Sequence, residues 1–432
     1  MDCDFHGISP RARLVPALVS VFLFAVSASA AVSGFTPQIR VGFSQGDQWE
    51  PAIAADNYGH VYVLYPQYAV VPDCPNCALP TMVLVHSNDN GVIWQGPRPI
   101  APTVSGQFDP QIIVDPADHR TVYAAWLQNE KSEITIAKSS DFGQSWSLMV
   151  AHRSRSETDK PVLAVHGRNV YAGFSRGDKL WVAGSHDGGL TFALANVNPG
   201  SRFGWAQASG ATVDPSGNVY ISWAGYIRSG VMKGAAALFV SKSSDGGKAW
   251  STTVLETSAP APDCSAERCP WAYLGAQIAL ASDESGTLYA LWNSGNFPAE
   301  PQRIYFSSST TEGATWAVPV DVSTAILGTE HAFPVITAGS AGDVRVAWMD
   351  KRNTPMWNTF SRTSTNGGAT WSAEIRISSY TKGYSYIKPE GFGFPFGDYF
   401  GLAIDSRGQT QVVWGEGLNY ETPGSIWYSR GR

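Results

Sequence analysis

One short phrase recurs along the chain. It reads Ser87-Asn-Asp-Asn-Gly-Val-Ile-Trp94 and then Ser139-Ser-Asp-Phe-Gly-Gln-Ser-Trp146. Further copies span Ser185–Phe192 and Ser243–Trp250, and two degenerate ones span Ser309–Trp316 and Ser364–Trp371. Successive copies begin 46 to 66 residues apart. A period of this length predicts a chain built from similar structural units.

Each position of the phrase has a physical role in a tight hairpin. The Asp or Asn side chain accepts backbone N–H groups of its own turn, and the Gly supplies the positive φ that such a turn needs. The Trp starts the following strand and packs between sheets. Each copy follows an alternating strand, such as residues 82–86 or 237–241. The phrase therefore predicts a hairpin between two strands of every unit.

A second pattern precedes each copy: an apolar strand, a polar turn and a strand ending in an aromatic residue. It occurs seven times, within residues 51–65, 110–126, 161–174, 209–223, 276–292, 334–348 and 400–414. The last unit stops after a third strand at 426–429, and we predict that residues 37–43 supply its fourth strand and close a ring. Four-stranded units without helical periodicity predict an all-β fold, a β-propeller with seven blades. Six blades is the alternative, if residues 261–300 form an inserted loop.

Composition limits the classes of protein and of partner. The 432 residues are 44% hydrophobic and 15% charged, with a net charge of −6, which excludes a disordered chain. This charge gives no footprint for a nucleic acid or for an anionic membrane surface. No composition shift divides residues 31–432, so we predict one propeller domain, acting as a monomer.

The first thirty residues have the pattern of an export signal. Arg11 and Arg13 precede an apolar run, residues 14–26, and a small-residue site ends at Ala30. This pattern predicts a secretory signal peptide, residues 1–30, and a secreted or periplasmic protein. An uncleaved anchor is the alternative, although the run is short for a membrane span and no later window is long enough.

Four cysteines remain after the predicted cleavage, as two local pairs. They are Cys74 with Cys77 and Cys264 with Cys269. In an exported chain these pairs predict two disulfides, each within its own loop. A four-thiolate zinc site joining both pairs is the alternative.

The recurring turn phrase resembles the Asp-box, or BNR repeat, of the sialidase superfamily, over about residues 50 to 414. Residues 397–405 and 348–352 are similar to segments of secreted bacterial sialidase-like proteins. The resemblance implies a propeller with a link to carbohydrate, either a glycosidase or a non-catalytic binding protein. It also implies that the turn phrases lie on the face opposite the active site.

The predicted strand order then gives the residues of the upper mouth, which precede each first strand or follow each second strand. They are Glu50, Asp109, Asp159, Lys160, Gln207, Tyr273, Glu330, His331, Asp398, Tyr399, Glu130, Arg176, Asp178, Arg228, Asn293, Asp350, Arg352, Glu416 and Tyr420. Four tryptophans, Trp49, Trp205, Trp271 and Trp357, fall at the same mouth. For these tryptophans we predict stacking on a sugar ring, with plain packing as the alternative. The aromatic candidates for ligand binding are Trp49, Trp205, Trp271 and Tyr273.

A sialidase mechanism, as the resemblance implies it, needs a Tyr nucleophile with a carboxylate base, an acid and three arginines that clamp the sialate carboxylate. The candidates are Tyr399 as nucleophile, Glu416 as its base and Asp398 as the acid. Arg176, Arg228 and Arg352 are the candidate clamp. The position of the family's first arginine holds Trp49, which departs from the pattern.

The acids of the mouth allow two other interpretations. Glu50, Asp109 and Asp398 provide the carboxyl pair of a different glycosidase, or they hold a cation such as calcium. Each of them is also a plausible cap of a strand-entry turn. The histidines lack metal-ligand spacing, so we predict no metal site and no cofactor. The sequence thus predicts a sialidase-like glycoside hydrolase that acts on a glycan or glycoconjugate, with a non-catalytic glycan- or protein-binding propeller as the alternative.

Overall fold

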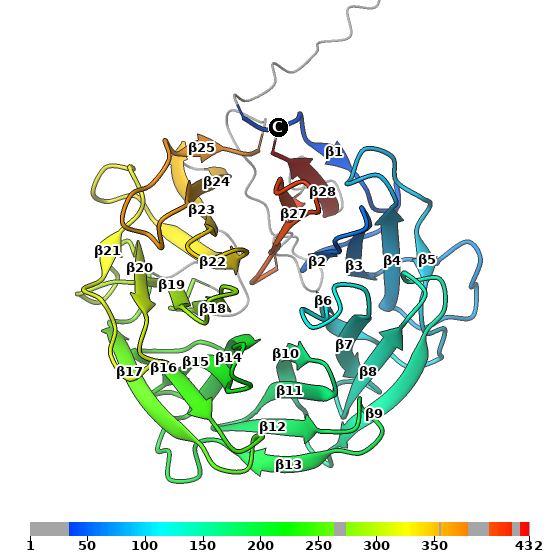
Figure 1. The fold of residues 1–432 in the computed structure, drawn as a ribbon, viewed down its shortest axis with the longest axis horizontal. Coiled ribbons are helices and arrows are strands. Elements are labelled where there is room, and N and C mark those ends of the chain that lie inside the picture. Colours follow the sequence, from blue (N-terminus) through cyan, green and yellow to red (C-terminus); the bar gives the residue numbers. More distant parts are fainter. Residues whose placement is uncertain (1–33, 263–273, 354–355, 379–396, 417–423, 432) are drawn as a thin grey trace, which may run out of the picture.

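The computed structural model describes residues 34–262, 274–353, 356–378, 397–416 and 424–431. All regular elements in these ranges are strands, and 28 strands form seven four-stranded antiparallel sheets around a central channel (Figure 1). The predicted all-β propeller with seven blades is confirmed, and six blades are excluded. Residues 278–294 belong to two strands of one blade and not to an inserted loop. The described ranges contain no helix long and apolar enough to cross a membrane.

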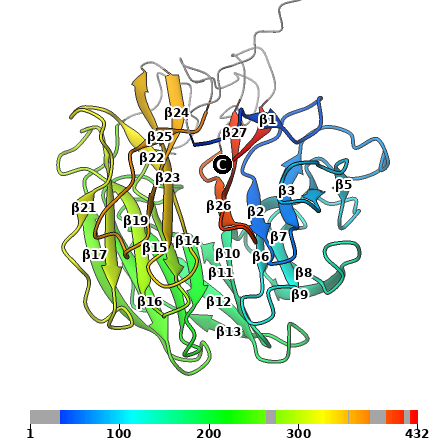
Figure 2. The same ribbon diagram turned by 45° about the horizontal axis from the view of Figure 1, so that its top comes forward.

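In every blade the first strand of the sheet lies next to the channel, and the other three follow toward the outside in sheet order (Figures 1 and 2). Blades 1 and 2 consist of β2 (Ala52–Ala55), β3 (Val61–Gln67), β4 (Thr81–Ser87), β5 (Arg98–Pro99), β6 (Phe108–Val114), β7 (Val122–Gln128), β8 (Glu133–Ser139) and β9 (Ser147–Arg153). Blades 3 and 4 consist of β10 (Asp159–His166), β11 (Asn169–Arg176), β12 (Lys179–Ser185), β13 (Ala193–Asn196), β14 (Trp205–Val213), β15 (Val219–Tyr226), β16 (Ala236–Ser243) and β17 (Ser251–Ser258).

The remaining blades complete the ring. Blades 5 and 6 consist of β18 (Ile278–Ser282), β19 (Leu288–Ser294), β20 (Arg303–Ser309), β21 (Val320–Asp321), β22 (His331–Ala338), β23 (Val344–Asn353), β24 (Met356–Ser364) and β25 (Ile375–Arg376). Blade 7 consists of β26 (Gly401–Ile404), β27 (Thr410–Glu416), β28 (Ser425–Arg430) and, as its outer strand, β1 (Ile39–Arg40). Ile39 pairs with Tyr428 and Arg40 with Trp427, so the two ends of the described chain meet in one sheet.

The core between the blades is built on the second strands, because these are covered on both faces. Most of them place one fully buried tryptophan in the same part of the blade: Trp126, Trp223, Trp292, Trp348 and Trp414. The indole N–H of Trp126 donates to Gln128 Oε1 at 2.9 Å, and that of Trp223 donates to Ser241 Oγ at the same distance. The rings fill the wedge between blades, and the N–H groups of Trp126 and Trp223 keep partners there, whereas the Trp292 N–H has no hydrogen-bond partner among the described residues.

The six turn phrases share one hydrogen-bond pattern. In blade 2, Ser139 Oγ donates to Asp141 Oδ1 at 2.8 Å and accepts the Gly143 N–H at 2.8 Å. Asp141 Oδ1 also accepts the Ser145 N–H at 2.9 Å. The Gly143 φ of 77° lies in the left-handed region, which a side chain disfavours. Every copy repeats the bond from the Gly N–H to the Ser hydroxyl, so the phrase fixes the hairpin by local contacts.

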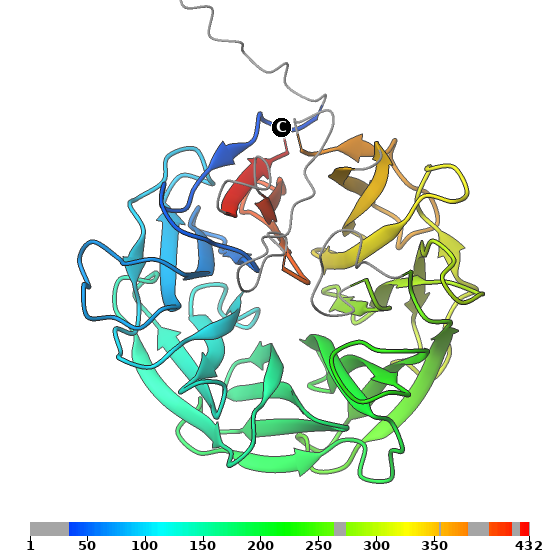
Figure 3. The same cartoon turned by 180° about the vertical axis from the view of Figure 1, so that it is seen from behind.

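In several blades an aspartate at the end of the first strand caps the turn that follows. The sequence alone predicted no role for this aspartate. In blade 4, Asp214 Oδ1 accepts the Asn218 N–H, and Asp214 Oδ2 accepts the Tyr220 hydroxyl at 2.8 Å. Asp56 binds the Tyr62 hydroxyl in the same way in blade 1, at 2.9 Å. The turn between the first and second strands and the turn phrase between the third and fourth strands thus lie on one face, because neighbouring strands are antiparallel. The first strands start at the opposite face, which forms the mouth, and Figure 3 shows the ring of blades from behind.

The hydrogen bonds at Asp141 predict an acid-sensitive contribution to stability. Although burial acts to raise it, the bonds from Ser145 and Ser139 lower the pKa of Asp141 to about 2. Its contribution is therefore complete above about pH 4, the unfolded value, and is lost as the pH falls through about 2. We expect Asp141→Ala to lower the free energy of unfolding by about 0.5 to 1 kcal/mol at pH 7, because water screens this exposed carboxylate.

Urea denaturation at pH 7 and at pH 2 measures this difference. The matched control is Asp73→Ala, which removes an exposed loop carboxylate and should leave stability unchanged. An Asp141→Ala effect that is equally large at both pH values would contradict the capping role.

Candidate functional site

At the mouth, the first strands of three blades begin with an irregular backbone conformation. Glu50, Asp109 and Lys160 each precede a proline and have a φ near 50°, which is uncommon for residues other than glycine. The pairing of β6 with β7 and that of β10 with β11 shift register at these points. Such bulges re-aim a side chain, and here they place three charged residues of consecutive blades in one cluster.

Lys160 is the centre of this cluster, which we call the lysine–acid cluster. Its Nζ lies 2.8 Å from Asp398 Oδ1. It also lies 3.4 Å from both Glu50 Oε1 and Asp109 Oδ1. The four residues come from blades 1, 2, 3 and 7, and the side chain of Lys160 is only 9% exposed. A buried ammonium with three carboxyl neighbours thus joins the first, second, third and last blades.

The cluster gives two of its acids opposite protonation behaviour. Burial raises the pKa of Glu50 well above its ordinary value, and the cation of Lys160 opposes this shift without cancelling it. Burial also acts to raise the pKa of Asp109, but Lys160 and Lys131 outweigh it, so that this pKa lies below the ordinary value. Of these two acids around one ammonium, Glu50 therefore holds a proton more readily than Asp109 does.

Glycine at position 397 allows this packing. Its φ of 67° is in the left-handed region, and a Cβ there would lie 2.0 Å from Glu50 Cγ. The backbone after it approaches Glu50 closely enough for the Asp398 N–H to lie 3.4 Å from Glu50 Oε1. A side chain at position 397 would push blades 1 and 7 apart at this point.

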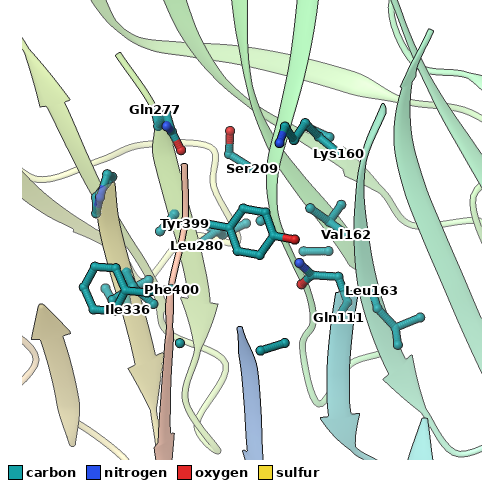
Figure 4. Close-up of a pocket in the computed structure, with 18 of the residues that line it drawn as sticks. Gln111, Lys160, Val162, Leu163, Ser209, Gln277, Leu280, Ile336, Tyr399 and Phe400 are labelled. Carbon is teal, nitrogen blue, oxygen red and sulfur yellow. The ribbon is translucent and has the colours of Figure 1, made fainter. Parts of the chain in front are cut away.

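A cavity of about 200 Å³ lies in the channel, against Lys160 and Tyr399, and all seven first strands contribute to its wall. Figure 4 shows Gln277, Ser209 and Lys160 around one end and Tyr399 lying across the middle. The Tyr399 ring centroid is 5.5 Å from Lys160 Nζ. Its hydroxyl is buried and has no hydrogen-bond partner among the described residues. Burial, with the charges of the cluster, raises its pKa well above the ordinary value, so the hydroxyl stays neutral.

The predicted arginine clamp is not assembled around Tyr399. The Arg176 guanidinium lies over the Trp181 ring, 4.5 Å from its centroid, within blade 3. Arg352 in blade 6 binds Asp350, at 2.6 Å, and Glu374. Arg228 is exposed in the loop after β15. The charges that act most on the Tyr399 hydroxyl are those of the lysine–acid cluster and not those of arginines.

Glu416, the candidate base, forms a hydrogen bond within its own blade. It is 2% exposed at the end of β27, and its Oε2 accepts the indole N–H of Trp414. Burial raises its pKa well above the ordinary value, although the Trp414 bond opposes this. A carboxyl with a raised pKa carries less of the ionised form that would activate a Tyr399 nucleophile.

The mouth tryptophans lie in three different environments. Trp49 is 3% exposed and packs on Tyr68 with ring centroids 4.3 Å apart, and Trp357 is 2% exposed beside Phe333. Trp205 is half-buried and donates its N–H to Gln207 Oε1 at 2.8 Å. Of these three, Trp205 alone is not fully buried. Trp271 and Tyr273 lie outside the described residues.

The structure also bears on the cation and cysteine predictions. Lys160 occupies the centre of the acids, where a calcium ion would have to sit, and no group of three potential metal ligands occurs in the described ranges. Cys74 and Cys77 form the predicted disulfide, with Cα atoms 5.4 Å apart. This pairing removes two ligands of the alternative zinc site. Cys264 and Cys269 lie outside the described residues.

No family model matches the chain, and no curated protein matches its sequence. Among solved structures, a protein of unknown function from Dyadobacter fermentans DSM 18053 has a TM-score of 0.52 at 12% identity, covering 93% of this chain and 99% of that one. An ulvan lyase, described as a new family of polysaccharide lyase, has a TM-score of 0.54 at 11% identity, covering 90% and 95%.

Sialidases are also among the structural neighbours. The Hadza microbial sialidase Hz136 has a TM-score of 0.48 at 12% identity, covering 89% of this chain and 66% of that one. At these identities, the likeness to the two structures of higher TM-score shows the fold alone.

Lys160 is the residue that sequence reasoning placed at the mouth without a role. A signal was present in the sequence: a charged residue followed by proline opens three successive blades, at Glu50-Pro51, Asp109-Pro110 and Lys160-Pro161. In blade 6 the same position holds Phe333-Pro334, and Phe333 has a similar φ of 56°. The dipeptide therefore marks the bulge that turns a side chain inward.

Removal of the Lys160 ammonium should destabilise the protein. We expect Lys160→Met to lower the free energy of unfolding by about 3 to 5 kcal/mol at pH 7, because buried carboxylates lose their countercharge. The loss should be smaller at pH 5, where these acids take up protons. Urea denaturation at both pH values measures it, with the exposed Lys233→Met as control. Unchanged stability of Lys160→Met at pH 7 would contradict the ion cluster.

Proposed function

We propose that the protein is a glycoside hydrolase, with Glu50 as general acid and Asp109 as the ionised carboxylate of its catalytic pair. The observation that carries the proposal is the opposite shift of two neighbouring pKa values around Lys160. Pairs of carboxyl groups whose environments separate their pKa values are the usual means of running acid and base chemistry at neutral pH. Glycosidic bond hydrolysis needs such a pair.

The proposed reaction uses each group in its favoured protonation state. Glu50 gives its proton to the glycosidic oxygen as the bond from that oxygen to the anomeric carbon breaks. Asp109 attacks the anomeric carbon, or it takes a proton from the water whose oxygen ends on that carbon. The cation of Lys160 favours the ionised form of Asp109. Glu50 Oε1 and Asp109 Oδ1 each lie 3.4 Å from Lys160 Nζ, so the two carboxyl groups are close enough to act on one glycosidic bond.

This pair is preferred to the Tyr399 mechanism on chemical grounds. The Tyr399 hydroxyl has a raised pKa and no hydrogen-bond partner among the described residues, and burial beside Trp414 raises the pKa of Glu416 as well. Arg176 and Arg352 are engaged within their own blades. A clamp for a sialate carboxylate therefore lacks its charged donors at the cluster.

Two further observations support a glycan as the substrate class. The six hairpins share the bond from the Gly N–H to the Ser hydroxyl, and the phrase that forms them resembles the Asp-box of sialidase-like proteins. The named neighbours include an ulvan lyase and sialidases, which are glycan-active proteins. We infer the same substrate class for this chain.

Glu50→Gln is the first test of the proposal. We expect it to reduce turnover of a cleavable fluorogenic glycoside at least about 100-fold, because general acid catalysis contributes roughly 10² to 10⁴. Asp109→Asn should reduce it similarly, and the exposed Glu284→Gln should have no effect. The substrate panel includes neutral glycosides, a uronoside and a sialoside. Turnover that survives Glu50→Gln but is lost in Tyr399→Phe would replace this proposal with the sialidase mechanism.

The pH profile gives an independent check. Activity should fall at acid pH as Asp109 is protonated below its ordinary pKa, and at alkaline pH as Glu50 loses its proton well above its ordinary pKa. In Lys160→Met the acid limb should move to higher pH. A panel of glycosides that bind but are never cleaved at any pH would favour the non-catalytic glycan-binding propeller.

We also propose that the protein is exported after cleavage of residues 1–30. The disulfide between Cys74 and Cys77 supports an oxidising compartment. Secretion from a bacterial host should yield a mature chain that begins at Ala31, as measured by intact mass and N-terminal sequencing. A secreted chain that still contains Arg11 and Arg13 would contradict cleavage at this site.

A further inference from the structure

The channel cavity has an unusual wall for a site next to an ion cluster. Of the described residues that line it, Lys160 is the only charged one. The other polar side chains are amides and hydroxyls, among them Gln277, Ser209 and Tyr399, and apolar side chains such as Leu280 and Ile336 fill the rest (Figure 4). The wall thus offers neutral hydrogen-bonding groups on an apolar surface.

The ammonium of Lys160 is not available to a ligand anion. It has three N–H donors, and three carboxyl oxygens lie within 3.4 Å of its nitrogen. A carboxylate brought into the cavity would also approach the ionised Asp109, and like charges repel strongly where water is excluded. The electrostatics therefore disfavour an anionic ligand.

Two polar groups of the wall lack partners. Gln277 is 6% exposed, and its Nε2 has no hydrogen-bond partner among the described residues. Its backbone is held beside the cavity by the bond from its N–H to Asn293 Oδ1, at 2.9 Å. The Tyr399 hydroxyl is the second unpartnered group. Buried polar groups without partners are costly, which points to a ligand or water that satisfies them.

The volume limits the size of that ligand. About 200 Å³ is smaller than the roughly 300 to 1,000 Å³ of pockets for drug-sized molecules. A single sugar ring, with hydroxyl groups at its edge and an apolar face, has a suitable size and chemistry for this wall. The Tyr399 ring in the middle of the cavity provides a surface for that apolar face.

We propose that the cavity binds one neutral sugar ring and discriminates against acidic sugars such as sialic and uronic acids. The inference rests on the proposed function, because Lys160 belongs both to the wall of this cavity and to the lysine–acid cluster that would cleave the glycosidic bond. Gln277 donates to a ring hydroxyl, and the Tyr399 hydroxyl binds a second one. The selectivity for neutral over acidic sugars arises because the other wall residues are uncharged and because the three N–H donors of Lys160 already face carboxyl oxygens.

Binding to the full chain tests the inference separately from turnover. Isothermal titration and ligand-detected NMR use the methyl glycosides of glucose, galactose, mannose and rhamnose against those of glucuronic acid and N-acetylneuraminic acid. At least one neutral glycoside should bind about tenfold or more tightly than either acid. Gln277→Leu should weaken it by about three- to tenfold, the effect of one lost hydrogen bond. Gln95→Leu, an exposed control, should not change it.

Filling the cavity gives a second variant. Ser209→Leu should abolish binding of the neutral glycoside, while its thermal unfolding shows whether the ring of blades is intact. Equal or tighter binding of an acidic glycoside would overturn the inference, as would unchanged binding in both Gln277→Leu and a folded Ser209→Leu.

The two proposals fail in different ways. Neutral-sugar binding that depends on Gln277, without cleavage of any glycoside, keeps this inference and overturns the hydrolase. Cleavage that needs Glu50 but shows no preference for neutral sugars keeps the hydrolase and overturns this inference.

Discussion

A buried ammonium surrounded by carboxyl groups links the fold of this protein to its proposed chemistry. Lys160 approaches acids from three other blades, including Asp398 of the blade in which both ends of the described chain meet. A charge with no partner would be very costly at this depth, so these blades are held in one relative position. The same arrangement separates the pKa values of Glu50 and Asp109. The contact that stabilises the seam thus also prepares an acid and a base.

The ring was predictable because its determinants are local. A turn phrase such as Ser139 to Trp146 forms its hydrogen bonds within a few residues, and seven strand pairs give the blade number. The site was less predictable because it depends on contacts that join residues far apart in the chain. Lys160 and Asp398 are 238 positions apart, and only the bulge before Pro161 brings the amine into the channel. The predicted strand order places Glu50, Asp109 and Asp398 at the mouth, but it does not show how deeply each carboxyl group is buried.

The candidate arginines show that a position at the mouth does not fix what a side chain contacts. Strand order alone places Arg176 and Arg352 at the mouth, but each has a nearer partner in its own blade: the Trp181 ring and the Asp350 carboxylate. Trp49, where the sialidase pattern has an arginine, packs on Tyr68 and is almost fully buried. A propeller fold therefore leaves room for different sets of functional groups at the channel.

The protonation of the acid pair can be observed without any substrate. Carboxyl ¹³C shifts of protein labelled at Glu and Asp, assigned by the signals lost in Glu50→Gln and Asp109→Asn, follow both groups through a pH titration. The account predicts that the Glu50 carboxyl keeps its proton well above its ordinary pKa, while Asp109 stays ionised below its own. Titration of both groups at ordinary values, or of Glu50 at the lower pH of the two, would contradict it.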